Sequence, residues 1–248
     1  MILIDDFVML GKTVPEVQKK SGRVFVCSAG YSHAMRGPIR VYPLARGKSP
    51  PRWSRCRVPL ERNPEDSRDE SWKLSGDRSP ANHPKINSCF EITGEVRKQE
   101  RPLFIQSLLS PSIQAANAKR KSLCIIEPES VPALSFEENE DSPDHPQISM
   151  FEDGQEIVDE GARRFRFQPY LEFKDEGGWH RLQMRGWCGY EWMRKQGDER
   201  RFQLAENWRL GQRPCLLVGN MNQHRNVWLI ISVLTPIRQM QLQLEAAE

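Results

Sequence analysis

Residues 164–184 read RFRFQPYLEFKDEGGWHRLQM and hold the clearest strand pattern of the chain. Apolar side chains occupy every second position, which is typical of a strand with one buried face: Phe165, Phe167, Pro169, Leu171 and Phe173. The run Asp175 to Gly178 predicts a hairpin turn, and Trp179 to Met184 predicts the returning strand. This stretch therefore indicates a sheet built from short antiparallel strands.

Similar strand patterns lie on both sides of this hairpin. Residues 22–30 and 38–44 predict two strands joined by the loop 31–37, and residues 56–60 predict a third, where Pro59 favours a sheet edge. Further strands are expected at 122–126, 215–220 and 226–234, and short helices at 103–118, at 187–201 and after a cap at Asp66 or Ser67. The expected fold is α+β and strand-rich, with small, partly antiparallel sheets or a barrel-like core and a few short helices.

Charge is distributed unevenly along the 248 residues, although the formal net charge is only +3. Residues 127–160 hold 12 acidic side chains and no Lys or Arg, whereas residues 12–73 hold 14 basic and 6 acidic ones. Such segregation indicates an anionic partner, or an acidic segment that lies against the chain's own basic surface. We interpret the chain as a basic strand-rich lobe (1–126), an acidic flexible connection (127–160) and an α+β lobe (161–248), which can also pack as one domain.

Composition also bears on location and cofactors. No apolar run approaches the ~20 residues of a membrane-spanning helix, and the N-terminus lacks the basic region of a signal peptide, so we expect a cytoplasmic protein without a membrane partner. The six cysteines are scattered, with no CxxC and no Cys/His pair at metal-ligand spacing. They are interpreted as buried free thiols, and no metal or other cofactor is predicted.

Catalytic signatures are weak. The carboxylates of Asp66, Asp69 and Glu70 could hold Mg²⁺ for phosphodiester cleavage, but the arginines interleaved with them would neutralise the field that a divalent ion needs. His33, in the loop 31–37, could act as a general base. No nucleophile or phosphate-loop signature is present. The sequence leans against an enzyme, and a metal-dependent nuclease remains an alternative.

The positive signal is arginine interleaved with aromatic residues. Arginine makes up 25 of the 36 cationic side chains, and arginine beside aromatic rings suits phosphate and stacked bases. The amide-rich loop 219–226 could read bases or phosphates as well. We predict contacts to DNA or RNA at Arg40, Tyr42, Arg52, Trp53, Arg55, Arg57, Lys119, Arg120, Lys121, Arg164, Arg166, His224 and Arg225.

Two stretches carry a resemblance to other proteins. Residues 26–43, with VCSAG and IRVYP, and residues 61–72, with ERN and DSRDESW, resemble an uncharacterised group of prokaryotic proteins associated with mobile elements and phage defence. The resemblance spans the first third of the chain and implies no activity and no site residue. The leading hypothesis is a non-catalytic nucleic-acid-binding module that is one subunit of a larger prokaryotic complex. The alternatives are a protein-interaction adaptor that uses the acidic segment 127–160, and the nuclease.

Overall fold

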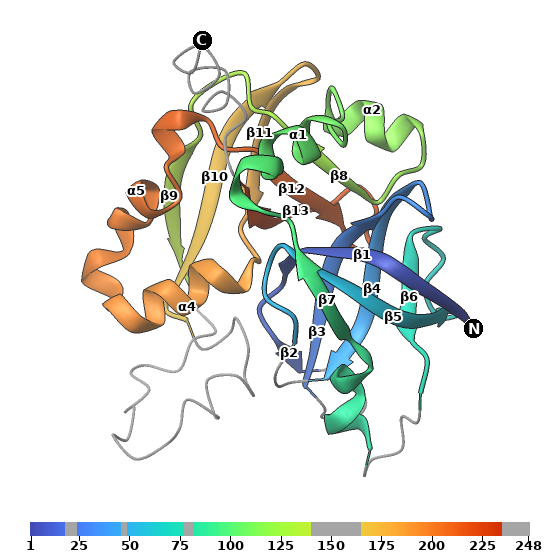
Figure 1. Cartoon of the computed structure of the whole chain (residues 1–248). Coiled ribbons are helices and arrows are strands. Elements are labelled where there is room, and N and C mark those ends of the chain that lie inside the picture. The colour runs from blue at the N-terminus through green and yellow to red at the C-terminus, as the bar shows by residue number, and fades with distance from the viewer. Residues whose placement is uncertain (18–23, 46–48, 77–81, 140–164, 235–248) are drawn as a thin grey trace, which may run out of the picture.

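The computed structural model describes residues 1–17, 24–45, 49–76, 82–139 and 165–234 (Figure 1). Its N-terminal half contains five strands that close into a barrel: β1 (Ile2–Lys12), β3 (Val24–Ser32), β4 (Gly37–Ala45), β5 (Ser54–Arg62) and β6 (Ser71–Leu74). They follow one another around the barrel in the order β1-β3-β4-β6-β5, and β5 pairs with β1 to close it. The expected strand-rich α+β fold with a barrel-like core is confirmed.

The order of these strands defines the type of barrel. Its third and fifth strands, β4 and β6, are parallel neighbours, and its fourth strand, β5, returns to the first. This is the Greek-key order of the OB-fold, a five-stranded barrel. Alternate side chains of each strand point into the barrel. On β5 these are Cys56, Val58 and Leu60, which are apolar and fully buried.

Two of the sequence predictions for this half were wrong. β5 is not an edge strand, because β1 lies on one side of it and β6 and β7 (Glu91–Glu95) lie on the other. Pro59 is tolerated because the pairing with β7 ends at Arg57 and the pairing with β6 begins at Leu60, so no ladder hydrogen bond is lost there. The segment after Asp66 forms a loop and then β6 rather than a helix.

The C-terminal half contains two three-stranded sheets. One has the order β13-β12-β8, with β8 at Leu123–Ile126, β12 at Leu216–Asn220 and β13 at Trp228–Val233. The other has the order β11-β10-β9, with β9 at Ala133–Glu138, β10 at Phe167–Asp175 and β11 at Gly178–Gln183. The predicted hairpin at 164–184 is confirmed as β10 and β11, and the strands expected at 215–220 and 226–234 pair with each other as β12 and β13. Together with the helices around them, these sheets form what we call the C-terminal lobe.

Short helices connect the strands. The helical pattern at 103–118 corresponds to α1 (Arg101–Gln106) and α2 (Ile113–Ala118), and the pattern at 187–201 corresponds to α4 (Trp187–Gln196) and the 3-10 helix η4 (Asp198–Gln203). The other helices of the described ranges are η1 (His83–Cys89), η2 (Lys98–Glu100), α5 (Leu204–Asn207) and η5 (Leu210–Gln212), and a two-residue strand, β2 (Glu16–Val17), pairs with β3.

The predicted boundaries between lobes differ from the observed pairing. β8 pairs with β12, and β9 pairs with β10, so residues 123–138 belong to the C-terminal sheets. Carboxylates of the predicted acidic connection form ion pairs with cations of β10, of β11 and of the residue before β10: Glu129 with Lys174, Glu137 with Arg181, and Glu138 with Arg166. The described part of the acidic segment therefore lies against the chain's own basic residues, and residues 140–160 lie outside the described ranges.

The C-terminal lobe packs on the outside of the barrel. Val8, Leu10 and Ala29 of the barrel share one buried cluster with Leu217 and Ile231 of β12 and β13. OB-fold barrels commonly bind oligonucleotides on the outer face of their second and third strands, which here are β3 and β4. Much of that face is covered by the chain itself.

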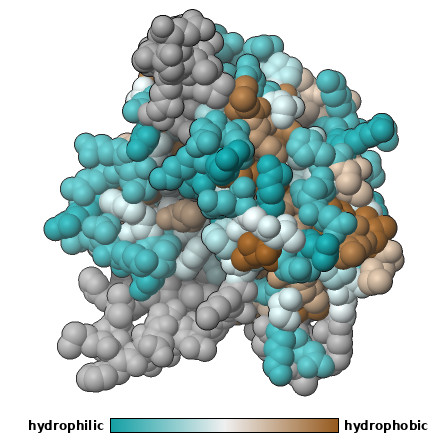
Figure 2. All heavy atoms as spheres, in the orientation of Figure 1, coloured by the Kyte–Doolittle hydropathy of each residue, from teal (hydrophilic) through white to brown (hydrophobic). Residues whose placement is uncertain are grey.

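The surface is mainly hydrophilic in the view of Figure 2, with an apolar area near the N-terminal end of β1. Its exposed side chains include Met1 and Leu3. Among the helices of the described ranges, none is long and apolar enough to cross a membrane. Of the cysteines, Cys56, Cys124 and Cys215 are buried as expected, whereas Cys27 and Cys89 are half-buried and Cys188 is exposed.

Candidate nucleic-acid interface

Two of the predicted phosphate ligands instead join the barrel to the C-terminal lobe. The side chain of Arg40 on β4 is 4% exposed, and its Nη2 donates to the carbonyl oxygens of Ser122 (3.0 Å) and Asn220 (3.3 Å). Burial lowers the pKa of the Arg40 guanidinium. Arg52 donates to the hydroxyl of Ser232 at 3.0 Å. Arg40 is therefore not available to a phosphate, and the prediction for it was wrong.

The two aromatic residues that were predicted to contact nucleic acid both pack against other rings of the protein. Trp53 is 3% exposed, and its ring packs edge-on against the ring of Phe104. The guanidinium of Arg101 lies 5.1 Å from the centre of the Trp53 ring. Tyr42 is half-buried, with its ring edge-on to Phe25. Trp53 cannot stack on a base without leaving the core, so its predicted role was wrong.

Two exposed arginines are engaged in surface ion pairs. Arg57 lies between Asp5 (2.6 Å) and Glu91 (3.2 Å), and Arg166 lies 2.9 Å from Glu138. Such exposed pairs contribute little to stability. They do reduce the positive potential that these two arginines present to an anion.

The other scattered candidates do not gather in one place. Arg55 is half-buried on β5, and Arg164 lies outside the described residues. His224 and Arg225 are exposed in the loop between β12 and β13, where Arg225 donates to the hydroxyl of Ser67 at 2.8 Å. That contact ties the loop to the segment between β5 and β6.

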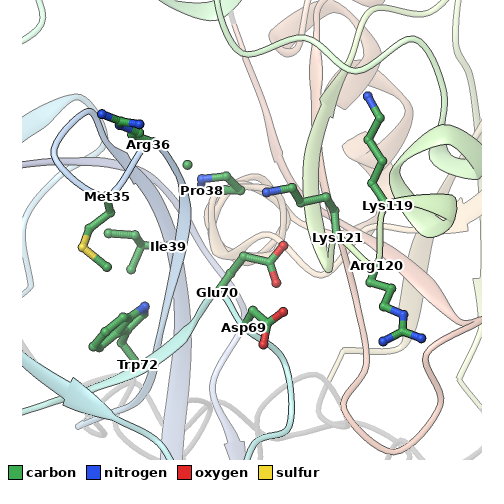
Figure 3. A pocket seen from close by; sticks show the side chains of 11 residues that line it. Met35, Arg36, Pro38, Ile39, Asp69, Glu70, Trp72, Lys119, Arg120 and Lys121 are labelled. Carbon is green, nitrogen blue, oxygen red and sulfur yellow. The ribbon is translucent and has the colours of Figure 1, made fainter.

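The triplet Lys119-Arg120-Lys121, in contrast, lines a cavity of about 210 Å³ between the two halves of the protein (Figure 3). Arg36, at the tip of the β3–β4 hairpin, lines the same cavity from the barrel side. In Figure 3, Lys121 extends toward the hairpin, while Lys119 and Arg120 project to either side. We call these four side chains and the cavity between them the cationic cleft.

The end of α2 positions the triplet. Ser112 caps the first turn of this helix with a 3.0 Å hydrogen bond, and the helix ends at Ala118 with Lys119 as its C-cap. Arg120 then takes a left-handed backbone conformation, with φ of 56°, and the N–H of Lys121 returns to the carbonyl of Ala116. The tight turn leaves all three cationic side chains exposed.

Ser122 fastens this turn to the barrel. Its N–H and its hydroxyl donate to the two carboxylate oxygens of Glu70, each at 3.0 Å, while its carbonyl accepts from Arg40. Glu70 is 7% exposed. The buried contacts therefore hold the triplet at a fixed place opposite the hairpin, and they commit the Glu70 carboxylate to a structural role.

The hairpin that carries Arg36 is anchored in a similar way. Asp6 of β1 accepts from the hydroxyl of Ser32 (2.5 Å) and from the N–H of Ala34 (2.9 Å). Burial alone would raise the pKa of Asp6, but these hydrogen bonds outweigh burial, and the pKa lies below its usual range. Arg36 itself has a left-handed backbone, with φ of 52°.

The carboxylates considered for catalysis do not form a metal site. Asp66 is buried in an ion pair with Arg68 and accepts from the hydroxyl of Ser71 at 2.7 Å. Burial opposes ionisation of Asp66, yet these hydrogen bonds hold its pKa below the usual value. Asp69 is exposed in the cationic cleft, and His33 is exposed at the hairpin tip. No group of three potential metal ligands occurs among the described residues.

Arg36 is the site residue that the sequence prediction omitted. It lies more than 80 positions before the triplet, and no local pattern relates the two segments. The available signal was its place in the predicted loop 31–37, because a cation at a hairpin tip is exposed by geometry.

The fold and the site define an OB-type barrel with a second, sheet-containing lobe and a cationic cleft between them. A family model described as a domain of unknown function (DUF8758) matches residues 5–105. No curated protein and no solved structure matches the chain. The matched span contains the barrel except the first three residues of β1, includes Arg36, and ends before the Lys119–Lys121 triplet.

Proposed function

We propose that this protein is a nucleic-acid-binding module whose cationic cleft holds the phosphate backbone. The observation that carries the proposal is the state of four side chains: Arg36, Lys119, Arg120 and Lys121. They line one cavity, and within the described ranges none of them has a side-chain hydrogen bond or ion pair. Like charges held together by the fold favour an anionic ligand, and a phosphate diester supplies one negative charge per nucleotide.

The balance of charge inside the cleft supports an anion. The residues that line the cleft include four cationic side chains and two carboxylates, those of Asp69 and Glu70. Both oxygens of Glu70 already accept hydrogen bonds from Ser122. The cations therefore exceed the carboxylates, unlike those of β10 and β11, which are paired with acidic neighbours.

The barrel adds a second, weaker line of support. OB-fold barrels often bind oligonucleotides, but a fold shared by many functions does not assign one. The wider setting that we propose, one subunit of a prokaryotic complex in a mobile element or a phage-defence system, rests on the sequence resemblance alone.

The two alternatives receive less support from the described residues. Three of the four carboxylates of residues 127–139 are paired with the chain's own cations, which leaves them less available to a partner protein. The buried carboxylates of Asp66 and Glu70 are held by hydrogen bonds from within the chain, which a nuclease metal ion would have to displace.

Fluorescence anisotropy with labelled single-stranded and double-stranded DNA and RNA tests the proposal. Titrations at about 50 and 200 mM salt cover a range in which binding through several phosphates weakens strongly. We expect salt-sensitive binding to at least one of these nucleic acids. The absence of binding to all of them, or an affinity that does not change with salt, would refute the proposal.

A further inference from the structure

A second cavity, of about 260 Å³, adjoins the cationic cleft. Arg36, Gly37, Pro38, Lys119 and Lys121 line both cavities. The second cavity lies between the outer face of the barrel at the β3–β4 hairpin and the C-terminal lobe at β8, with residues 107–111 along its rim. It is therefore a part of the β3–β4 face that the C-terminal lobe does not fill.

The two cavities differ in chemistry. Most of the residues that line the second are apolar, and they include side chains of the buried cluster between the lobes: Leu10, Tyr31, Leu108, Leu109, Leu123, Ile125 and Leu217. Because these side chains pack between the two lobes, the wall is preformed. The shared cations stand where this apolar space opens into the cationic cleft.

The hairpin backbone leaves room at the junction. Gly37 belongs to both linings, and a Cβ placed on it would meet no atom closer than 3.9 Å. A ligand that spans the junction needs an apolar part on one side and a negative charge on the other. A nucleotide, with an aromatic base and a phosphate, has this form.

We propose that the second cavity receives one unstacked base of a single-stranded nucleic acid, whose adjoining backbone phosphates are held by Arg36, Lys119 and Lys121. This inference rests on the proposed function and extends it to the class of nucleic acid. A base in a duplex is paired and stacked and enters a cavity only after extrusion, whereas a single strand presents its bases at little cost. The site should therefore favour single strands, and it should need a base as well as phosphates.

The test compares three ligands with the full chain: a single-stranded oligonucleotide, a fully abasic strand of the same length, and a duplex of the same sequence. We expect the single strand to bind about tenfold or more tightly than the other two, since one base held against apolar or aromatic side chains contributes on this scale. If all three bind equally, the base cavity is refuted while the proposed function stands. If none binds, the proposed function fails as well.

A pair of variants places the effect in the cavity. Ser107 is exposed and lines only the second cavity, so Ser107→Trp should obstruct it without disturbing the core. Gln106→Trp, at an exposed neighbour that lines neither cavity, is the matched control. We expect S107W to lose the preference for the single strand and to keep its affinity for the duplex, with Q106W unchanged. A preference that survives in S107W would overturn the assignment of the base to this cavity.

Discussion

Removing two cations from the cleft should change the salt dependence of binding by an amount that follows from the structure. Lys119 and Lys121 are exposed, and their side chains have no partner in the described ranges, so the double variant Lys119→Ala/Lys121→Ala should fold normally. The backbone hydrogen bond from Lys121 to Ala116 does not depend on either side chain and is retained. Any change in binding can then be attributed to the lost charges.

The magnitude comes from counterion release. For a single strand, the logarithm of the binding constant falls with the logarithm of salt by about 0.7 for each phosphate neutralised. With one phosphate neutralised by each cation, the four cations of the natural protein give a slope of about −2.8, and the two that remain in the variant give about −1.4. Between 50 and 200 mM salt, the affinity of the natural protein should thus fall about 50-fold and that of the variant about 7-fold.

The assay is an anisotropy titration at several salt concentrations, and the slope is the measured quantity. Arg57→Ala/Arg166→Ala is the control, because it removes the same charge from arginines that are already paired. We expect its slope to match that of the natural protein. Equal slopes for the natural protein and the Lys119/Lys121 variant would refute the cleft, and an equal reduction in the control would show that only net charge matters.

Three further predictions concern the contacts that hold the cleft together. Ser122→Ala leaves one buried oxygen of Glu70 without its donor, so urea denaturation should show a loss of about 1–3 kcal/mol; an unchanged free energy of unfolding would contradict this role. Asp66→Asn leaves the buried guanidinium of Arg68 without its ion pair, and the free energy of unfolding should fall by about 3–5 kcal/mol; a variant as stable as the natural protein would show that the pair is dispensable. The pKa of Asp6 is lowered in the folded state, so its contribution to stability is present above the unfolded pKa and is lost as pH falls through the folded one. Denaturation from pH 6 down to about 2, across the usual Asp pKa near 4, should therefore show Asp6→Asn less stable than the natural protein near neutrality and the difference vanishing in acid, and a difference independent of pH would exclude this carboxylate as the cause.

Local patterns predicted the strands that have one covered face. The hairpin at 164–184 alternates apolar and polar residues because β10 packs one side against the core, and such alternation is visible in sequence. The first barrel strand was not predicted, although β1 is 11 residues long. Its apolar run from Phe7 to Leu10 is buried on both sides, between the barrel interior and the C-terminal lobe, so the period of two is lost.

The candidate site depends on which cationic side chains are exposed and which have a hydrogen-bond partner, and the sequence does not show this. Arg36 and Arg40 are four residues apart beside the same hairpin, and both read as arginines near aromatic and apolar residues. In the structure, Arg40 donates to carbonyl oxygens of the C-terminal lobe, while Arg36 at the hairpin tip has no side-chain partner in the described ranges. The difference arises from the packing of residues more than 80 positions away.

The same packing makes the site a property of both halves of the chain. The barrel exposes Val8, Leu10 and Ala29 on its outer surface, and these side chains are buried only because the C-terminal lobe covers them. The family model spans residues 5–105 and so contains Arg36, but it ends before the other three cations of the cleft. A protein that shares only this span would carry one of the four charges and neither the triplet nor the β8 wall of the second cavity. Phosphate binding of the kind proposed here should therefore accompany the barrel only where the C-terminal lobe is present as well.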